Sequence, residues 1–274
     1  MTKKKVASVL LASSLVPALL PSISDASDPP LAGQEAEEFL QVARVVESRD
    51  LGAGVTQSKR LTLSNGERTA RAVWKTINVY RPMQKFSDGG FPEIGFRDSY
   101  KNEIAAYELD KLLVLHLVPP TVERRIRGER GSLQLWLDDT ITEGERMSRG
   151  LTAPDTRRWN DQIHRLRIWH QLIDDRDFNN IHNVLVDGDF RIWAIDHSRA
   201  FRLGKSLQTP EGLKRFDREL VERLGDLDID LLRAGLGRWL TKSQLETLLV
   251  RRDLILDRVE RLVAERGEES VLFP

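Results

Sequence analysis

Apolar positions recur at helical spacing through much of the chain. In Tyr100–Leu113 and Thr156–Ile173 they fall three and four residues apart, which is typical of amphipathic helices. Pro210–Arg266 has the same spacing, with interruptions at Gly235–Gly237 and at residues 241–243. We therefore expect two well-defined helices followed by a C-terminal helical region.

Two pairs of shorter segments have the character of strands. The Asn65–Gly66 pair is a strong signal for a tight hairpin turn, and it joins Lys59–Leu63 to a long predicted strand over Thr69–Val79. Thr121–Arg125 and Ser132–Leu137 flank a second turn that contains glycine. These segments predict an antiparallel sheet in the first half of the chain.

Three further segments complete this reading of the pattern. Pro82–Arg97 lacks clear periodicity and is predicted to be a loop, and Asp138–Gly150 is a polar stretch that suits a domain boundary. Glu35–Ser48 is predicted to be a short amphipathic helix. Its apolar face would comprise Phe39, Val42, Ala43 and Val46.

The N-terminus resembles a secretory signal. Lys3–Lys5 is a basic start, Val6–Leu20 is an apolar run too short for a stable transmembrane anchor, and Ser24–Ala26 offers small residues for cleavage. Residues 1–26 are therefore predicted to be a signal peptide and residues 27–34 a linker. The protein would be periplasmic or secreted; the alternative is a cytoplasmic protein with an amphipathic N-terminus.

Composition excludes several classes of function. The chain of 274 residues has 42 basic and 42 acidic side chains, so no overall field favours nucleic acid as a partner. It has no cysteine, which excludes disulfides and thiolate metal sites. Its five histidines do not have the spacing of a zinc site. The oligomeric state is not indicated by the sequence.

A predicted hairpin in the second half brings two oxygen-bearing side chains together. Val184–Val186 and Arg191–Ile195 are short apolar strands, and Asp187–Asp189 supplies the turn between them. Asn183 precedes the first strand and Asp196 follows the second, so the hairpin should hold them close to each other. Carboxylate and amide oxygens together suit Mg²⁺ with substrate phosphates. We therefore expect a magnesium site here.

Trp169–Phe201, which contains this hairpin, resembles the catalytic core of the atypical protein-kinase-like superfamily. That branch includes phosphatidylinositol 3- and 4-kinases, HipA-type toxin kinases, secretory-pathway casein kinases and uncharacterised bacterial relatives. Upstream, Ala72–Lys75 is similar to the Val-Ala-Ile-Lys of the third kinase strand. The resemblance implies an α+β, two-lobed protein-kinase-like fold. Residues 35–138 would form a small antiparallel-sheet N-lobe with helix C, and residues 139–274 a mainly helical C-lobe.

The resemblance also implies how ATP would be bound. Lys75 would neutralise the phosphates, and Glu103, near the start of the predicted helix C, would orient Lys75. Four further residues would contact the nucleotide from the strands, the hinge and the glycine-containing loop: Val73, Leu137, Gly52 and Gly54.

Two alignments of the catalytic loop remain open. Asp175-Arg176-Asp177 is similar to the His-Arg-Asp of protein kinases, which makes Asp177 the catalytic residue and Asn183 a metal ligand, with one inserted residue between them. Alternatively Asp175 corresponds to the Asp of lipid-kinase loops, with Asn180 as the ligand. We favour the first, because the hairpin fixes Asn183 against Asp196, 13 residues later.

The implied function is a metal- and ATP-dependent phosphotransferase that uses Mg²⁺ or Mn²⁺. Its acceptor would be a hydroxyl group on a protein, a lipid or a small molecule. The alternative is a catalytically silent kinase-fold module that binds a nucleotide or a partner. Metal-dependent turnover of ATP separates the two hypotheses.

Overall fold

A computed structural model of the chain describes residues 31–52, 58–85, 92–175, 177 and 179–274. The predicted signal peptide and Gly54 lie outside the described residues. The signal peptide therefore stays a prediction.

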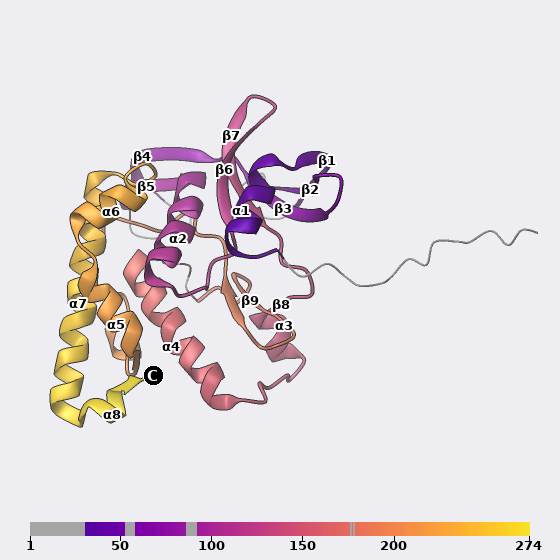
Figure 1. Ribbon diagram of the computed structural model, residues 1–274. Coiled ribbons are helices and arrows are strands. Elements are labelled where there is room, and N and C mark those ends of the chain that lie inside the picture. The colour runs from indigo at the N-terminus through magenta and orange to yellow at the C-terminus, as the bar shows by residue number, and fades with distance from the viewer. Residues whose placement is uncertain (1–30, 53–57, 86–91, 176, 178) are drawn as a thin grey trace, which may run out of the picture. The chain divides into compact units, whose positions relative to one another are not determined.

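A five-stranded antiparallel sheet forms the first part of the fold, with strand order β1-β2-β3-β7-β6 (Figure 1). The predicted turn between β2 and β3 is confirmed: Gly66 has φ +98, and the side chain of Asn65 accepts hydrogen bonds from the backbone nitrogens of Glu67 and Arg68. The strands are β1 (Arg44–Asp50), β2 (Lys59–Ser64), β3 (Thr69–Lys75), β6 (Thr121–Ile126) and β7 (Glu129–Leu135).

Helix α1 (Gly33–Val42) packs on one face of this sheet, but it is shorter than predicted. Ala43 has an extended backbone, and β1 begins at the next residue, Arg44. Within β1, Val45 pairs with Leu63 of β2. The predicted helix over Glu35–Ser48 is therefore wrong over residues 43–48, where hydrogen bonding to β2 replaces helical hydrogen bonding. Val42, the last residue of α1, and Val46 of β1 are both exposed.

The predicted long strand also divides. After β3 ends at Lys75, the chain turns and β4 (Asn78–Gln84) pairs antiparallel with β5 (Glu93–Ser99) in a separate two-stranded sheet. The prediction of one strand over Thr69–Val79 and of a loop over Pro82–Arg97 is corrected accordingly. Most β4 side chains are exposed, so this strand lacks the alternation that reveals a half-buried one.

Two helices have the predicted bounds. Helix α2 (Tyr100–Leu113) starts at Ser99, whose side chain accepts a hydrogen bond from the backbone nitrogen of Lys101. Helix α4 (Thr156–Ile173) starts in the same way at Asp155. Such caps satisfy backbone donors that the first helical turn leaves unpaired.

The predicted hairpin between Asn183 and Asp196 is confirmed. It consists of β9 (Val184–Val186) and β10 (Ile192–Ala194), and β8 (Ile141–Thr142) adds a third strand. Helix α3 (Glu143–Ser148) follows β8, so the polar stretch Asp138–Gly150, which we proposed as a domain boundary, contains two short elements.

The C-terminal region is helical, as predicted, with a short parallel pair of strands added. The pair joins β11 to β12 near the C-terminus. The elements are η1 (Pro210–Gly212), β11 (Phe216–Asp217), α5 (Arg218–Asp226), α6 (Ile229–Leu236), α7 (Lys242–Arg266), α8 (Glu268–Val271) and β12 (Leu272–Phe273).

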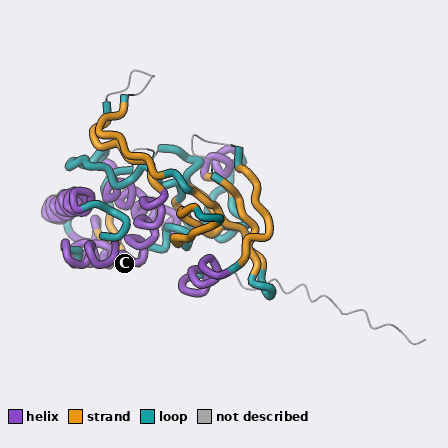
Figure 2. The backbone as a smooth tube through the Cα atoms, turned by 90° about the horizontal axis from the view of Figure 1, so that it is seen from above, coloured by secondary structure: helices purple, strands orange, loops and turns teal. Residues whose placement is uncertain are grey.

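Buried apolar side chains form two clusters. One joins α1 to the five-stranded sheet, and the other joins the C-terminal helices to α4. Helix α2 contributes Ala105, Leu109 and Leu113 to the second cluster, so it packs with the helical part (Figures 1 and 2). The fold is thus α+β, with a small antiparallel-sheet lobe and a mainly helical lobe.

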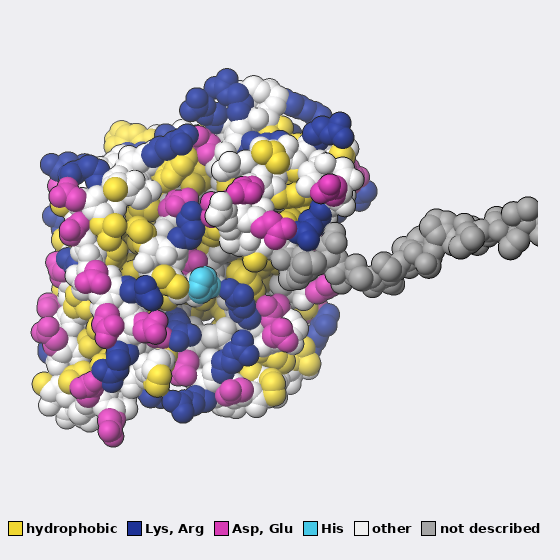
Figure 3. Space-filling view, viewed as in Figure 1, with side chains coloured by type: hydrophobic (Ala, Val, Ile, Leu, Met, Phe, Trp, Pro, Cys, Tyr) yellow, Lys and Arg dark blue, Asp and Glu magenta, His cyan; other side chains and the backbone are white. Residues whose placement is uncertain are grey.

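Two surface properties bear on partners. On the face drawn in Figure 3, basic and acidic side chains are interspersed, with no large area of one sign. Within the residues that the structure describes, no helix is long and apolar enough to cross a membrane.

Candidate active site

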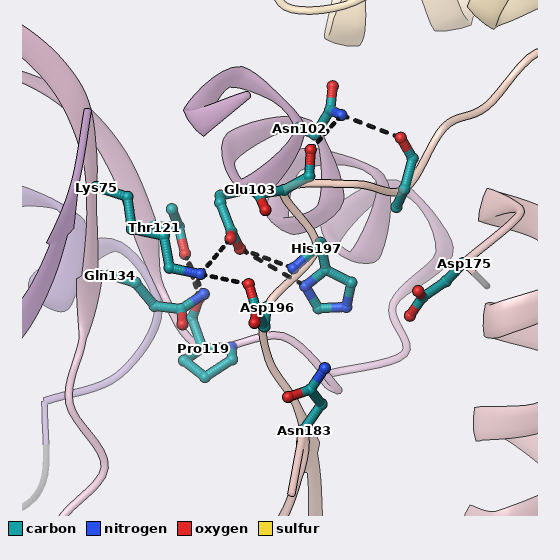
Figure 4. A network of polar contacts seen from close by, with 12 residues as sticks. Lys75, Asn102, Glu103, Pro119, Thr121, Gln134, Asp175, Asn183, Asp196 and His197 are labelled. Atoms are coloured by element: carbon teal, nitrogen blue, oxygen red, sulfur yellow. Dashed lines mark hydrogen bonds and ion pairs between the residues drawn. The ribbon is translucent and has the colours of Figure 1, made fainter. Parts of the chain in front are cut away.

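The side chain of Lys75 joins the two lobes. Its ammonium nitrogen lies 2.5 Å from Oε1 of Glu103 and 2.7 Å from Oδ1 of Asp196 (Figure 4). The Glu103 side chain is only 2% exposed and that of Lys75 12%. A strand, a helix and a hairpin that are distant in sequence therefore converge on one cation.

Strand alternation, the dipole of α2 and the backbone conformation after β10 explain this convergence. Lys75 is the last residue of β3, where Trp74 points into the sheet cluster and Lys75 points to the opposite face. Glu103 lies in the first turn of α2, where the positive end of the helix dipole favours a carboxylate. Asp196 follows β10 with a left-handed backbone, φ +65, which a residue other than glycine adopts only when its surroundings hold it.

The ion pairs determine the charge states of the partners. Burial by itself would lower the pKa of Lys75, but the carboxylates of Glu103 and Asp196 raise it above its ordinary value. Burial by itself would raise the pKa of Asp196, but the Lys75 ammonium holds it below its ordinary value. Lysine and aspartate are therefore both charged at neutral pH.

His197 and Asn102 fix the segment that follows Asp196. The backbone nitrogen of His197 donates to Oε2 of Glu103 at 3.1 Å, and Trp169 donates to Nε2 of the fully buried imidazole. Burial lowers the pKa of His197, so the ring is neutral. The Asn102 amide donates to the carbonyl oxygens of Ser198 and Ala200 at 2.8 and 3.0 Å.

Sequence reasoning missed both of these residues as parts of the site. Asn102 carries no signal beyond its position beside Glu103. For His197, the one signal in the sequence was its position next to Asp196. We read it as structural because the five histidines do not have the spacing of a metal site.

The hairpin brings Asn183 close to Asp196. Val184 pairs with Ala194, and the backbone nitrogen of Ile195 donates to the carbonyl oxygen of Asn183 at 3.0 Å. The side chains of Asn183 and Asp196 lie near each other in Figure 4.

Asp177 lies at the exposed edge of this cluster. Its Oδ2 accepts hydrogen bonds from the side-chain amides of Asn180 and Asn183, each at 3.2 Å. Asn180 uses its own side-chain oxygen to accept from the backbone nitrogen of His182. The two asparagines thus hold the Asp177 carboxylate beside the hairpin.

Asp175 has a different environment. It is 4% exposed, its Oδ2 lies 3.0 Å from Nδ1 of His170, and its Oδ1 accepts from the backbone nitrogen of Asp177 at 3.0 Å. Burial by itself would raise the pKa of Asp175, but the hydrogen bond with His170, the nearby imidazoles and the backbone hydrogen bond from Asp177 together hold it below its ordinary value. This carboxylate shapes the loop from inside.

The remaining predicted nucleotide contacts are more peripheral. Val73 is half-buried on the same face of β3 as Lys75. Leu137 is half-buried against the sheet cluster. Gly52 is exposed with φ +64, a conformation that favours glycine.

The available donors suit a hard divalent cation. In the described part of the chain, no group of three or more His, Cys, Asp or Glu side chains could hold a metal. Asn183 and Asp196 together offer amide and carboxylate oxygens. Mg²⁺ commonly takes one or two protein oxygens and completes its shell with phosphate oxygens and water. The two side chains therefore fit a metal that arrives with a nucleotide.

Three solved structures have a similar fold. The structure of hydra Fam20 with sugar has a TM-score of 0.64 at 17% sequence identity, over 87% of this chain and 91% of that chain. A Golgi casein kinase with Mn/ADP bound has a TM-score of 0.61 at 16% identity, over 86% and 77%. The Helicobacter pylori proinflammatory kinase CtkA has a TM-score of 0.51 at 8% identity, over 84% and 98%.

No protein-family model matches the sequence, and a search of curated proteins finds no significant match. At such low identities the similarity concerns the fold. The chain has a kinase-like fold, which confirms the kinase-like resemblance in its fold and the fold class predicted from sequence.

Proposed function

We propose that the chain is a phosphotransferase that moves the γ-phosphoryl group of ATP to a hydroxyl group of an acceptor, with Mg²⁺ or Mn²⁺. The observation that carries this proposal is the cluster around Lys75, whose ammonium group contacts both Glu103 and Asp196. Asp177 and Asn183 border the same cluster. The Golgi casein kinase with Mn/ADP bound supports the choice of nucleotide and metal.

Each residue has a role that its surroundings suit. Asn183 and Asp196 would hold the metal, which when bound neutralises charge on the β- and γ-phosphate oxygens. Lys75, oriented by Glu103, binds phosphate oxygens. Its contact with Asp196 is replaced in part as the phosphates enter.

Asp177 would act on the acceptor. It orients the hydroxyl group and accepts its proton while the acceptor oxygen forms a bond to the γ-phosphorus. The bond from that phosphorus to the bridging oxygen breaks, and ADP leaves with the electron pair. Asp177 is exposed and held by neutral amides, so it can meet an incoming group.

The second hypothesis is a silent nucleotide-binding module. One observation favours it: Asn183 lies six positions after Asp177, one more than the kinase-type loop leads us to expect. The acceptor is open under the first hypothesis, whether protein, lipid or small molecule. Export of the protein, which we also propose, requires a donor outside the cytoplasm.

Nucleotide binding tests the site. ATP with Mn²⁺ should raise the melting temperature of the full chain, and Asp196→Ala should remove that shift without unfolding the protein. Asp189→Ala removes an exposed carboxylate from the turn of the same hairpin and serves as the matched control. A wild type that shows no shift at millimolar ATP would contradict the proposal.

Turnover then separates an enzyme from a silent module. Asp177→Asn should lower metal-dependent ATP turnover by several orders of magnitude and keep the thermal shift, because the group acts on the acceptor. Asp175→Asn should act mainly through loop stability. Activity lost with Asp175→Asn and retained with Asp177→Asn would favour the lipid-kinase alignment, and a wild type that binds without turnover would favour the silent module.

A further inference from the structure

The face of the sheet that carries Lys75 also carries two arginines. Residues paired directly across antiparallel strands project to the same face, as do residues two apart in one strand. Arg60 of β2 pairs with Val73, and Arg71 lies two residues before Val73 on β3. Arg60, Arg71, Val73 and Lys75 therefore share one face.

The opposite face of these two strands packs into the hydrophobic core. Leu61, Ala72 and Trp74 alternate with the residues named above and are buried together with α1. The face with the arginines is the one that looks toward Asp196. Gln134, the partner of Val73 on β7, lies beside Lys75 on that side in Figure 4.

Trp136 brings the two guanidinium groups together. It follows β7, and its backbone nitrogen donates to the carbonyl oxygen of Arg71 at 2.9 Å. The guanidinium carbons of Arg60 and Arg71 lie 5.5 and 5.7 Å from the centre of its ring, within reach of a cation–π contact. Arg71 also pairs with Asp138. We name Arg60, Arg71 and Trp136 the arginine–tryptophan cluster.

The arginine–tryptophan cluster lies at a distance from Lys75 that the base of a nucleotide could span. Two residues along a strand span about 6.6 Å and neighbouring strands lie about 4.8 Å apart, so Arg60 starts roughly 8 Å from Lys75 and reaches farther with its side chain. A nucleotide whose terminal phosphates meet Lys75 has its base a comparable distance away. Val73 and Arg60 would then cover that base.

Guanidinium groups stack on aromatic faces and on the planes of nucleic-acid bases. We infer that Arg60 binds the purine base of the donor nucleotide by stacking its guanidinium group on the face of the base. The cation–π contact with Trp136 would hold that guanidinium group in position. This inference rests on the proposed function, because it names the group that the same site recognises. Arg60 is thus a specificity-determining residue for the base, and Lys75 for the phosphates.

Comparing two ligands tests the inference. The full chain and Arg60→Met would be titrated by calorimetry with ATP and with tripolyphosphate, each with Mn²⁺. Methionine keeps an unbranched side chain against Trp136 but removes the cation. The affinity for ATP should fall about tenfold, as expected from a partly desolvated cation–π contact, and the affinity for tripolyphosphate should stay within about twofold.

Arg44→Met is the matched control. Arg44 is exposed on the neighbouring strand β1, where it pairs with Ser64 at the other end of β2, and its loss changes the net charge of the sheet equally. Melting temperatures would establish that all variants are folded. An equal loss for both ligands, or no loss for ATP, would overturn the inference, because Arg60 would then act through its charge alone or not at all. A wild type that fails to bind ATP would instead overturn the proposed function itself.

Discussion

At the scale of single residues, the carboxylates of the site differ in burial and in the partners that stabilise their charge. Glu103 is buried against Lys75 and the backbone of His197, and Asp175 is buried against His170. A buried carboxylate without such partners would cost several kcal/mol, so these two are committed to the scaffold. Asp177 is exposed, and among the described residues its carboxylate accepts hydrogen bonds from two side-chain amides. This contrast is the physical reason for preferring Asp177 as the group that meets the acceptor.

Asp110 gives a prediction that is independent of the site. It is 2% exposed near the end of α2, and its Oδ1 accepts from the backbone nitrogen of Leu117 at 2.9 Å. Burial raises the pKa of Asp110 to about 7, although backbone hydrogen bonds oppose the shift. Between its ordinary value and 7 the folded protein therefore keeps a proton that the unfolded chain has released.

The stabilisation from that proton is present at low pH and is lost as the pH rises through this window. Relative to Asp110→Asn, the wild type should lose about 2 kcal/mol of its free energy of unfolding between pH 5 and pH 8. Urea unfolding of both proteins at several pH values measures the difference, in which other titrating groups cancel. Parallel curves for the two proteins would show that Asp110 is ionised throughout.

At the scale of elements, the sequence was most informative where one face of an element is buried. Tyr100–Leu113 and Thr156–Ile173 were predicted with their observed bounds, because helical periodicity and capping residues agree. The strand β4 was missed because most of its side chains are exposed, and β5 because an apolar residue, Ile94, is exposed while the polar Asp98 and Ser99 are buried, so neither strand shows a regular apolar alternation. The helix at the N-terminus was predicted too long, because Val46 continues its apolar periodicity although the chain from Arg44 onward already pairs with β2.

Substitution of Gly131 in β7 tests how closely β3 and β7 must approach each other beside Lys75. A Cβ atom at this position would lie 2.3 Å from the carbonyl oxygen of Lys75 and 2.9 Å from the Trp74 ring. Gly131→Ala must therefore push β3 away from β7 beside Lys75. We expect a loss of about 2 kcal/mol in the free energy of unfolding and a smaller thermal shift with ATP and Mn²⁺.

Gly188→Ala is the matched control. Gly188 lies in the turn of the β9–β10 hairpin, where an added Cβ atom meets nothing within 4 Å and the backbone is not left-handed. Its substitution should change stability by less than about 0.5 kcal/mol. Equal effects of the two substitutions in urea unfolding would mean that β3 and β7 separate without cost.

At the scale of the whole molecule, the two lobes meet through α2 and through the segment after Asp196. The backbone nitrogen of Ser99 donates to the carbonyl oxygen of Ser198, and Asp98 pairs with Arg199. The sequence predicted the site residues of both lobes through their resemblance to kinases. It could not predict these links, because nothing in Asp98 or Arg199 alone distinguishes a contact across 101 residues from a solvated surface charge.

Arg251 makes the corresponding link on the helical side. This residue of α7 is fully buried, and its guanidinium group donates to the carbonyl oxygens of Leu172 at the end of α4 and of Arg202 and Gly204 after Asp196. Burial lowers the pKa of Arg251 to about 10, so it is still charged at neutral pH. One side chain therefore joins α7, the end of α4 and the segment after the β9–β10 hairpin.

Removing this side chain should loosen all three segments together. Arg251→Met would leave three carbonyl oxygens without their donor, and each buried unsatisfied group costs about 1–3 kcal/mol. We expect the free energy of unfolding to fall by at least about 3 kcal/mol in urea, and the thermal shift with ATP and Mn²⁺ to shrink because Asp196 lies just before the released segment. Arg261→Met changes an exposed arginine of the same helix and should have little effect on either quantity. If both variants behaved alike, Arg251 would not be needed to hold the segment after Asp196.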